Sequence, residues 1–445
     1  MIGIQIFYII FIITGLIFSI LFYYGLKINN YLKFKLSLIV FSIVISFYFF
    51  EIFLEFNQLN TKTNVQIAKQ EGIDFDNRNT IDVLIDLNES GIEAYPNFYP
   101  GLLMRDSSTL NGIYANQDKV LPFGGISNIT TTWFDKESGN YAIIKTDEHG
   151  FNNPKGLYNK EIDIVLLGDS FVEGVSVNAN KNISAYLRQS GLTTINSGKK
   201  SIGPLMKLAI LKEYAEPLKP KIVLWQYFVN DYNILKTFEI NSSLLMQYLN
   251  ENDFSQNLIL RQDKIDYAIK DYLDKKLSTK KIKNEETSRE ELINFYKDFL
   301  KIFPNILKLT YLRSELNLKP KPMPKPEKEK ELEIFKRILI QSKKNVSEWG
   351  GELYFVYLPS SGRYKTGGNE YEIYEFRDYI FNMVNELNIP MINIHNEVFF
   401  LQDDPLSLFP FRTSFHYSSQ GYQLVAEAIA ERLKLDNIIL SNKIN

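Results

Sequence analysis

The 445-residue chain contains no cysteine, which excludes disulfide bonds and thiolate metal sites. This absence does not locate the protein, because many exported proteins also lack disulfides. Histidine is scarce, so any histidine base or ligand must be His149, His395 or His416. Three scattered histidines indicate no metal site, and no sequence motif implies a cofactor. The net charge of -2 gives no argument for nucleic-acid binding.

Charged side chains are missing from the first 26 residues, and two long apolar runs stand near the N-terminus. The run Ile4–Leu26 is long enough to cross a bilayer core, which needs about 20 residues. A second run, Leu36–Leu54, is interrupted by Glu51 alone. A short segment with three lysines and no acidic residue, 27–35, joins the two runs.

These runs predict a two-helix transmembrane anchor over residues 1–56 with its lysine-rich turn in the cytoplasm. The main domain then lies on the extracytoplasmic side of the cytoplasmic membrane, in the periplasm or outside the cell. A cleaved signal peptide is the alternative for the first run, although it lacks a basic start and an A-x-A cleavage site. A buried core helix is the alternative for the second run.

The pattern of the chain changes at Glu161. Residues 57–160 are rich in Asn, Gly, Thr and aromatics, and they predict a stalk followed by irregular, β-rich structure. Helical segments and short apolar stretches then alternate, which predicts an α/β domain over 161–445 with a parallel sheet covered on both faces. The predicted strands are Ile162–Leu167, Thr193–Ile195, Ile222–Phe228, Leu353–Leu358 and Met391–Ile394.

A long helical insert, about 235–351, separates the third and fourth predicted strands. It contains an amphipathic face at Ile265, Ile269, Tyr272 and Leu273. Further on are a capping-box pattern at Ser288–Glu291 and a proline-rich spacer at Pro320–Pro326. The insert is either a packing accessory or a lid that gates the site or docks a partner.

Polar motifs follow the predicted strands at their carboxyl ends, where sites of parallel sheets gather. The first strand runs into Gly168-Asp169-Ser170, which exposes Ser170 Oγ and places its N–H beside a helix N-terminus. The second strand is followed by a Gly- and Ser-rich turn through Ser201, and the third ends near Asn230. Taken singly, the serine motif is more typical of a turn or helix cap and the second motif of a plain strand-to-helix turn. An Asx-turn that closes the strand is the alternative for Asn230.

The last motif places His416 on a loop just before a C-terminal helix whose apolar residues have core spacing. A loop histidine taken alone is more often structural than catalytic. His395 follows a strand and is interpreted as structural. His149 stands in the turn before the sheet domain, where it either shapes the turn or lines the site.

The order Ser, Gly-turn, Asn and His, each at a strand end or before a helix, resembles the SGNH (GDSL-type) hydrolase family. The resemblance covers about Glu161 to Leu433 without the insert. The surroundings of these motifs are most similar to membrane-anchored members of bacterial envelopes. Their shared stretches are Asp147–Phe151, Gly203–Leu205, Val223–Tyr227, Asp404–Pro410, His416–Tyr417 and Gly421–Tyr422.

The resemblance implies a three-layer fold with a mainly parallel, five-stranded, flavodoxin-like sheet. It implies that Ser170 is the nucleophile and His416 its base. The N–H groups of Ser170 and Ser201, with the amide of Asn230, would form the oxyanion hole. Two positions depart from the family. Ser201 stands where an oxyanion glycine is usual, and Thr413 stands where the family has an Asp that orients the histidine. Asp404 in the same loop is the candidate replacement, and a backbone carbonyl is the alternative.

The resemblance implies an esterase or O-acyltransferase that acts on acylated cell-envelope glycans through a Ser170–His416 acyl-enzyme, with a membrane acyltransferase as a candidate partner. The two departures motivate an alternative. In it, the chain is a non-catalytic envelope protein that keeps the fold in order to bind glycan or to assemble with an acyltransferase.

Overall fold

The computed structural model describes residues 29–59, 69, 72–283, 309, 330–364, 371–412 and 414–438. The chain divides into two compact units: Met1–Thr61 with Ser288–Lys319, and Lys62–Thr287 with Pro320–Asn445. Three predicted features lie outside the described residues: the apolar run Ile4–Leu26, the capping box Ser288–Glu291 and the spacer Pro320–Pro326.

The first unit contains the helix α2, Asn30–Leu59, which coincides with the second predicted apolar run. Its segment Asn30–Phe53, 24 residues with a mean hydropathy of 2.3, is long and apolar enough to cross a membrane. Within the described residues it is the one helix that meets this test. Its 6% buried share does not fit a core helix, whereas a signal sequence near the N-terminus would meet the same test. The second helix of the anchor and its sidedness stay predictions.

The second unit is built on a five-stranded sheet with the order β6-β5-β7-β8-β9, and all its pairings are parallel. This is the doubly wound, flavodoxin-like strand order. The five predicted strands are confirmed, each within two residues of its predicted ends. Their bounds are β5 Ile164–Leu167, β6 Thr194–Asn196, β7 Ile222–Tyr227, β8 Glu352–Tyr357 and β9 Met391–Asn393.

Helices separate the strands and pack in two groups. α7 packs against α13, which also lies against β8, whereas α6 packs against α16 and borders β6. The helices are α4 Thr80–Glu89, α5 Ser170–Glu173, α6 Ile183–Gln189, α7 Pro204–Ile210, α8 Asp231–Thr237, α9 Ser243–Asn250, α10 Gln262–Lys283, α13 Lys330–Glu348, α14 Tyr371–Glu386, α15 Ile394–Glu397 and α16 Ser419–Leu435. A π-turn, Leu211–Ala215, continues α7, and short 3₁₀ turns lie at Pro100–Arg105, Leu157–Asn159, Ala179–Lys181, Glu216–Leu218, Glu239–Asn241, Leu258–Arg261, Ser361–Tyr364, Phe399–Leu401, Pro405–Leu408 and Pro410–Arg412.

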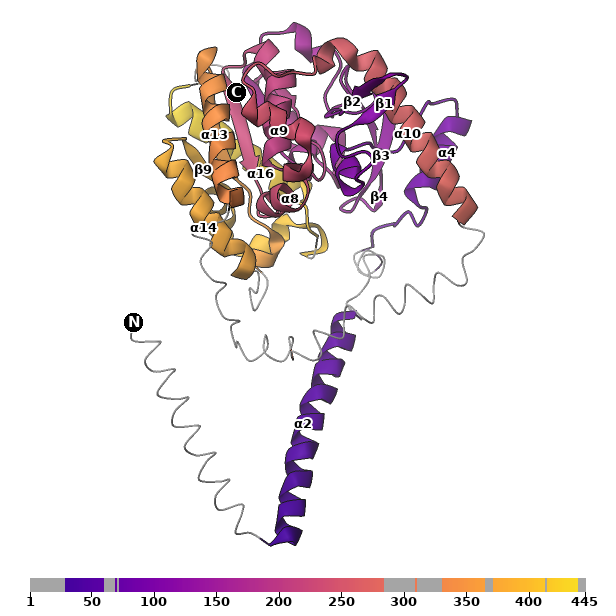
Figure 1. Ribbon diagram of the computed structural model, residues 1–445, viewed down its shortest axis with the longest axis vertical. Coiled ribbons are helices and arrows are strands. Elements are labelled where there is room, and N and C mark those ends of the chain that lie inside the picture. The colour runs from indigo at the N-terminus through magenta and orange to yellow at the C-terminus, as the bar shows by residue number, and fades with distance from the viewer. Residues whose placement is uncertain are drawn as a thin grey trace. The chain divides into compact units, whose positions relative to one another are not determined.

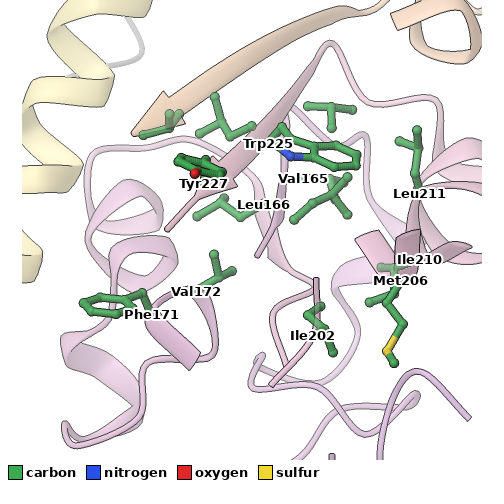
Figure 2. Packing of buried hydrophobic residues seen from close by; sticks show 14 of the residues in the cluster. Val165, Leu166, Phe171, Val172, Ile202, Met206, Ile210, Leu211, Trp225 and Tyr227 are labelled. Carbon is green, nitrogen blue, oxygen red and sulfur yellow. The ribbon is translucent and has the colours of Figure 1, made fainter. Parts of the chain in front are cut away.

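The core lies between the sheet and these helices. Figure 2 shows Leu166 of β5 and Trp225 of β7 near Phe171 of α5 and Met206 of α7, and all four are fully buried. Every residue of the inner strands β5 and β7 and of the edge strand β6 is buried, as expected for a parallel sheet covered on both faces.

The segment predicted as a stalk and irregular region shares this core. Phe98, Leu121, Phe123 and Phe151 are buried within the same hydrophobic cluster as the sheet residues. Two antiparallel hairpins occur here: β1 (Ile113–Ala115) with β2 (Asp118–Val120), and β3 (Thr130–Asp135) with β4 (Asn140–Lys145). The hairpins agree with the predicted β-rich character, whereas the helix α4 was not predicted.

α10, within the predicted insert, packs against the first of these hairpins (Figure 1). On its predicted apolar face, Ile265, Ile269 and Leu273 are buried. Asp266 of this helix also accepts hydrogen bonds from the N–H and hydroxyl of Ser127, at 2.8 and 2.6 Å. The described part of the insert is therefore packed onto the domain.

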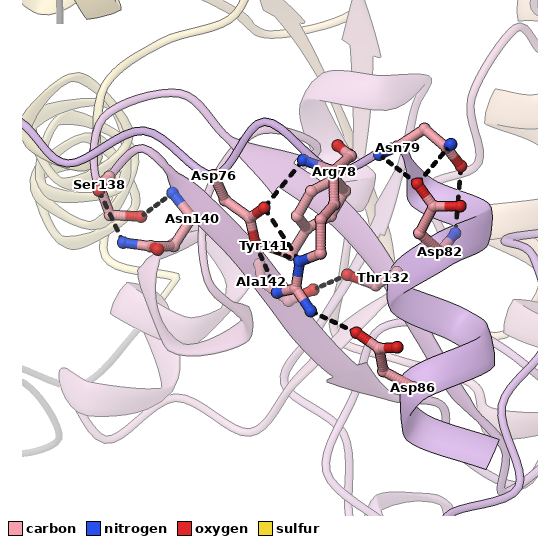
Figure 3. A network of polar contacts seen from close by, with 10 residues as sticks. All are labelled: Asp76, Arg78, Asn79, Asp82, Asp86, Thr132, Ser138, Asn140, Tyr141 and Ala142. Atoms are coloured by element: carbon pink, nitrogen blue, oxygen red, sulfur yellow. Dashed lines mark hydrogen bonds and ion pairs between the residues drawn. The ribbon is translucent and has the colours of Figure 1, made fainter. Parts of the chain in front are cut away.

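A polar network holds α4 and the β3–β4 hairpin together (Figure 3). Asn79 and Asp82 form a capping box at the start of α4. Arg78 pairs with Asp76 and Asp86, and its carbonyl accepts a hydrogen bond from the Tyr141 hydroxyl of β4 at 2.8 Å. The ion pairs are exposed and add little stability, so the network mainly fixes the position of the hairpin.

Candidate active site

Ser170 stands at the carboxyl end of the inner strand β5, as the sequence predicts. It is the first residue of α5, and its side chain is 7% exposed. Asp169 is the N-cap of this short helix, and its Oδ1 accepts the N–H of Phe171 at 3.0 Å. The turn leaves little room: a Cβ on Gly168 would lie 2.1 Å from Cγ2 of Val172. Glycine is therefore required where the strand turns into the helix.

His416 lies on the loop before α16 and is held by contacts on both sides. The next residue, Tyr417, is buried and donates its hydroxyl hydrogen bond to the Pro359 carbonyl at 2.7 Å. Ser418 caps α16 by accepting the N–H of Gly421 at 3.1 Å. The imidazole ring packs against Phe171, with ring centroids 4.9 Å apart. Residues far apart in the chain thus fix the ring beside the helix that begins with Ser170.

The fold brings Ser170 and His416 into direct contact. His416 Nε2 lies 2.8 Å from Ser170 Oγ, a normal hydrogen-bond distance. When the imidazole is neutral with its proton on Nδ1, Nε2 accepts the serine hydroxyl hydrogen. This is the geometry that a histidine needs in order to take the proton of a serine nucleophile.

The surroundings strongly favour the neutral imidazole. Burial is the largest cause that lowers the pKa of His416, to about 3, and the positive charges of Lys136 and Lys200 add to it. His416 is therefore uncharged at neutral pH, which is the state of a free base. The same environment makes the imidazolium that forms during proton transfer costly.

Asp404, the candidate orienting acid, is turned to another partner. Its Oδ2 lies 2.6 Å from Nη2 of Arg412 in a largely exposed ion pair. No carboxylate within the described residues hydrogen-bonds Nδ1 of His416, and Thr413 itself lies outside them. The assignment of Asp404 as the acid that orients His416 is therefore corrected. The physical reason is that an adjacent guanidinium on the same loop pairs with this carboxylate.

Ser201 follows β6, the neighbour of β5, and adopts the backbone conformation that its glycine-type position requires. Its φ is +58°, in the left-handed region, which costs a non-glycine residue about 1–2 kcal/mol. Pro100–Arg105 packs tightly over it, since a Cβ on Gly101 would lie 2.5 Å from the Ser201 carbonyl oxygen. The backbone of Ser201 thus takes the conformation that allows its N–H to serve the predicted role.

Asn230 follows β7, the strand on the other side of β5. Its side chain makes no capping hydrogen bond to α8, which argues against the simple Asx-turn interpretation. Its buried Oδ1 has no hydrogen-bond partner within the described part of the chain. Oδ1 is an acceptor, so this vacancy by itself does not assign the role of oxyanion donor, which would belong to the Nδ2 group of the same amide.

A buried charge cluster supports the strand ends, and the sequence did not reveal it. Lys207 of α7 forms an ion pair with Asp231 and donates to the Gln226 carbonyl at 2.7 Å. Burial raises the pKa of Asp231 to about 7, against the opposing effect of Lys207. Asp169 also lies close enough to raise the pKa of Asp231. The Lys207–Asp231 ion pair fixes the segment that ends in Asn230. Its only signal in the sequence is Asp231, which directly follows Asn230.

The other two histidines make packing contacts. His149 packs edge-on against Tyr158 with ring centroids 4.6 Å apart, and its Nδ1 lies 3.3 Å from Gln262 Oε1. His395 Nδ1 lies 2.8 Å from the Tyr364 hydroxyl. Burial, with the charges of nearby arginines, lowers the pKa of His395 to about 4. These contacts agree with the structural interpretation of His395. His149 also makes packing contacts, and whether it lines the site stays a prediction.

No protein-family model and no curated protein matches the chain. Among solved structures, it is similar to a lipolytic protein of the G-D-S-L family from Desulfitobacterium hafniense DCB-2, with 15% identity over 60% of this chain and 97% of that chain and a TM-score of 0.33. A lipase/acylhydrolase from Enterococcus faecalis shows 14% identity over 62% and 96% of the chains, with a TM-score of 0.32. An acetyl xylan esterase shows 11% identity over 61% and 100%, with a TM-score of 0.32. Since these TM-scores lie below 0.5, the function is argued from the chain's own residues.

Proposed function

We propose that this chain is an SGNH-type serine hydrolase, an esterase or O-acyltransferase that uses a Ser170–His416 dyad. The observation that carries the proposal is the 2.8 Å contact between Ser170 Oγ and His416 Nε2 at the carboxyl end of β5. Four features support it: the serine at a tight strand-to-helix turn, the neutral and partly buried histidine, the left-handed Ser201 and the placement of Asn230 after the neighbouring strand β7 with no capping hydrogen bond from its side chain.

In this mechanism, His416 Nε2 removes the Ser170 hydroxyl proton while Oγ attacks the acyl carbonyl. The new oxyanion accepts hydrogen bonds from the N–H groups of Ser170 and Ser201 and from the Asn230 amide. The ester C–O bond then breaks, and the proton on His416 passes to the leaving alcohol. Water or a sugar hydroxyl attacks the acyl-enzyme in the second half, again with His416 as base. Water gives an esterase, and a sugar hydroxyl gives a transferase.

The substrate class and location are further parts of the proposal. The resemblance to envelope members of the family suggests acylated cell-envelope glycans as substrates and a membrane acyltransferase as partner. The apolar helix α2 supports attachment to the cytoplasmic membrane, with the hydrolase domain on its extracytoplasmic side. Reporter fusions after residue 60 test this topology, because reporter activity in the cytoplasm contradicts it.

A non-catalytic glycan-binding or assembly role is the second candidate. It is favoured by one observation: His416 lacks a carboxylate partner within the described residues, and its surroundings oppose its protonated form. A scaffold would keep the fold and the site's shape without turning over an ester.

Labelling with a fluorophosphonate probe decides between the two candidates. We expect the full-length protein in detergent micelles to be labelled covalently at Ser170. The Ser170→Ala variant should lose all labelling while its circular dichroism and melting temperature stay close to those of the wild type. Ser176→Ala is a matched control, since it removes a buried serine of the same region and should leave labelling intact. Failure of the folded wild type to react would contradict the hydrolase and favour the scaffold.

A further inference from the structure

Two lysines from separate elements act on the candidate active site. Lys200 directly precedes Ser201 in the turn after β6, and Lys136 lies in the turn of the β3–β4 hairpin. Their charges both act on the partly buried imidazole of His416 and lower its pKa. The dyad thus lies in a locally positive environment, although the whole chain carries a net charge of -2.

The turn that carries Lys136 is fixed to the loop of the catalytic base. Oε2 of its neighbour Glu137 accepts the N–H of Ser419, three residues after His416, at 2.8 Å. Asp135, on the other side of Lys136, accepts a hydrogen bond from Nδ2 of Asn178 at 3.0 Å. At the far end of the turn, the Gly139 carbonyl accepts the Asp76 N–H at 2.8 Å. Figure 3 shows the Asp76–Arg78 segment that braces this hairpin.

Lys200 is exposed and is placed by contacts of its own. Its backbone N–H donates to Glu173 Oε2 at 2.9 Å, and its ammonium lies over the Tyr99 ring, 5.2 Å from the centroid. Glu173 does not supply a free countercharge, because its Oε1 pairs with the buried Lys199 at 3.3 Å and accepts the Asn97 amide at 3.0 Å.

Neither ammonium group has a carboxylate within ion-pair distance among the residues that the structure describes. The nearest acidic neighbours in sequence or contact each face another group: Asp135 accepts from Asn178, Glu137 accepts from Ser419, and Glu173 pairs with Lys199. Lys136 is also half-buried, and burial lowers its pKa. Two cations without a direct carboxylate partner, one half-buried and one exposed, attract an anion to this part of the site.

We propose that Lys136 and Lys200 form an anion subsite that binds a carboxylate or phosphate on the alcohol portion of the ester substrate. This inference rests on the proposed hydrolase function and narrows its substrate to acylated anionic glycans. A bound anion offsets both lysine charges, so that protonation of His416 becomes less costly when the correct substrate is present. The substrate thereby supplies part of the charge stabilisation that an orienting carboxylate provides in a triad.

A pair of acetyl esters that differ by one charge tests the subsite. We expect the full-length protein to hydrolyse the acetyl group of 4-acetoxybenzoate with a kcat/KM at least about tenfold higher than that of methyl 4-acetoxybenzoate. A tenfold ratio is modest for the attraction of a charge pair near a protein surface. In the Lys136→Met/Lys200→Met double variant, this preference should disappear while hydrolysis of the methyl ester persists. Lys155→Met, which removes an exposed lysine elsewhere, should keep the preference. Equal rates for both esters with Ser170-dependent hydrolysis would overturn the subsite and leave the proposed function standing.

A binding measurement decides the subsite without turnover. The three histidines give a simple ring-proton NMR spectrum, in which His416→Gln assigns one signal. Titration of the Ser170→Ala protein with glucuronate and with glucose 6-phosphate should shift the His416 signal, and the stronger ligand identifies the anion as carboxylate or phosphate. Glucose should leave the signal unmoved, as should either anion with the double lysine variant. If neither anion moves the signal, the subsite is absent. If neither ester is hydrolysed and Ser170 is not labelled, the hydrolase proposal fails instead.

Discussion

The turn that carries Ser170 and the loop that carries His416 are held in place in different ways. Around Ser170 the constraints are local: a buried strand, the small Gly168, and the cap that Asp169 provides for Phe171. Around His416 they come from distant segments, as with Tyr417 bound to the Pro359 carbonyl and Glu137 bound to Ser419. The nucleophile is therefore positioned by its own sequence neighbourhood, and the base is positioned by tertiary contacts.

The electrostatic surroundings of the two residues differ in the same way. Asp169, beside the nucleophile, serves the local cap. The acid nearest to the base in the sequence motif, Asp404, pairs with Arg412, and lysines from two other elements act on the imidazole. Proximity in sequence thus correctly indicates the partners of the serine turn and misidentifies those of the histidine.

The largest effect should follow from removing the base. His416→Gln keeps a polar side chain of similar size but cannot accept the Ser170 proton, so the fluorophosphonate labelling rate should fall by about 10²–10⁴. A time course of labelling, with samples quenched at intervals and read by in-gel fluorescence, measures this rate. His395→Gln is the matched control, since it changes a histidine bonded to Tyr364 and should leave labelling unchanged. A His416→Gln protein that reacts as fast as the wild type would show that Ser170 has another base.

Removing the amide donor should have the next largest effect. Asn230→Ala leaves Ser170 and His416 in contact but removes one predicted oxyanion donor, so ester hydrolysis should slow by about 10²–10³ in kcat. Steady-state kinetics separates this from a change in KM, which should stay close to the wild-type value. Asn233→Ala, on the adjoining helix α8, provides the control. A rise in KM with kcat unchanged would instead assign Asn230 to binding of the substrate in its ground state.

The pH profile tests the tertiary environment of the base. Histidine acts as a base when neutral, that is, above its pKa, so the lowered pKa of His416 extends reactivity toward acid. At pH 5 an ordinary histidine is neutral in only about 3% of molecules, whereas one with its pKa near 3 is almost fully neutral. Labelling rates should therefore stay nearly level from pH 8 to pH 5 and fall below pH 4. A half-maximal rate near pH 6.5 would contradict the desolvating, positive surroundings.

The charged residues around His416 also predict how the pH profile changes in a variant. Lys136 and Lys200 disfavour the imidazolium, so replacing both with Met should move the fall of the labelling rate in acid to higher pH. Glu137 and Glu173, the carboxylates near these lysines, are each held by other partners and remain in the double variant. Burial is the larger cause of the low pKa of His416, so the pH at which the labelling rate is half-maximal should stay below 6.5.

The smallest effect should come from Asp404. Since its carboxylate pairs with Arg412, Asp404→Asn should change kcat/KM by less than about fivefold, the factor that corresponds to the upper end of about 1 kcal/mol for an exposed ion pair. Steady-state ester hydrolysis measures this ratio. A loss of about 10⁴, the size expected when an orienting acid is removed, would show that Asp404 reaches His416 during catalysis.

Much of the fold was predictable because it rests on local patterns. The five strands of the sheet are short, buried apolar runs such as Ile222–Tyr227, and their alternation with helices requires parallel pairing. The region 57–160 was harder to interpret, because α4 depends on the Asn79–Asp82 capping box and buries only Val83 and Leu84. Its apolar residues pack on the sheet domain, so their periodicity within their own segment is weak.

The sequence by itself determined the strand-turn-helix of Ser170, the carboxyl-edge positions of Ser201 and Asn230, and the loop before α16 that bears His416. Each of these depends on interactions within a few residues, which glycine, capping residues and apolar periodicity encode directly. Tertiary structure alone decided that Ser170 and His416 meet at 2.8 Å, that Asp404 turns to Arg412, and that the charges of Lys136 and Lys200 act on the imidazole. The physical reason is that burial and Coulomb interactions depend on distance in space, which separation along the chain does not encode.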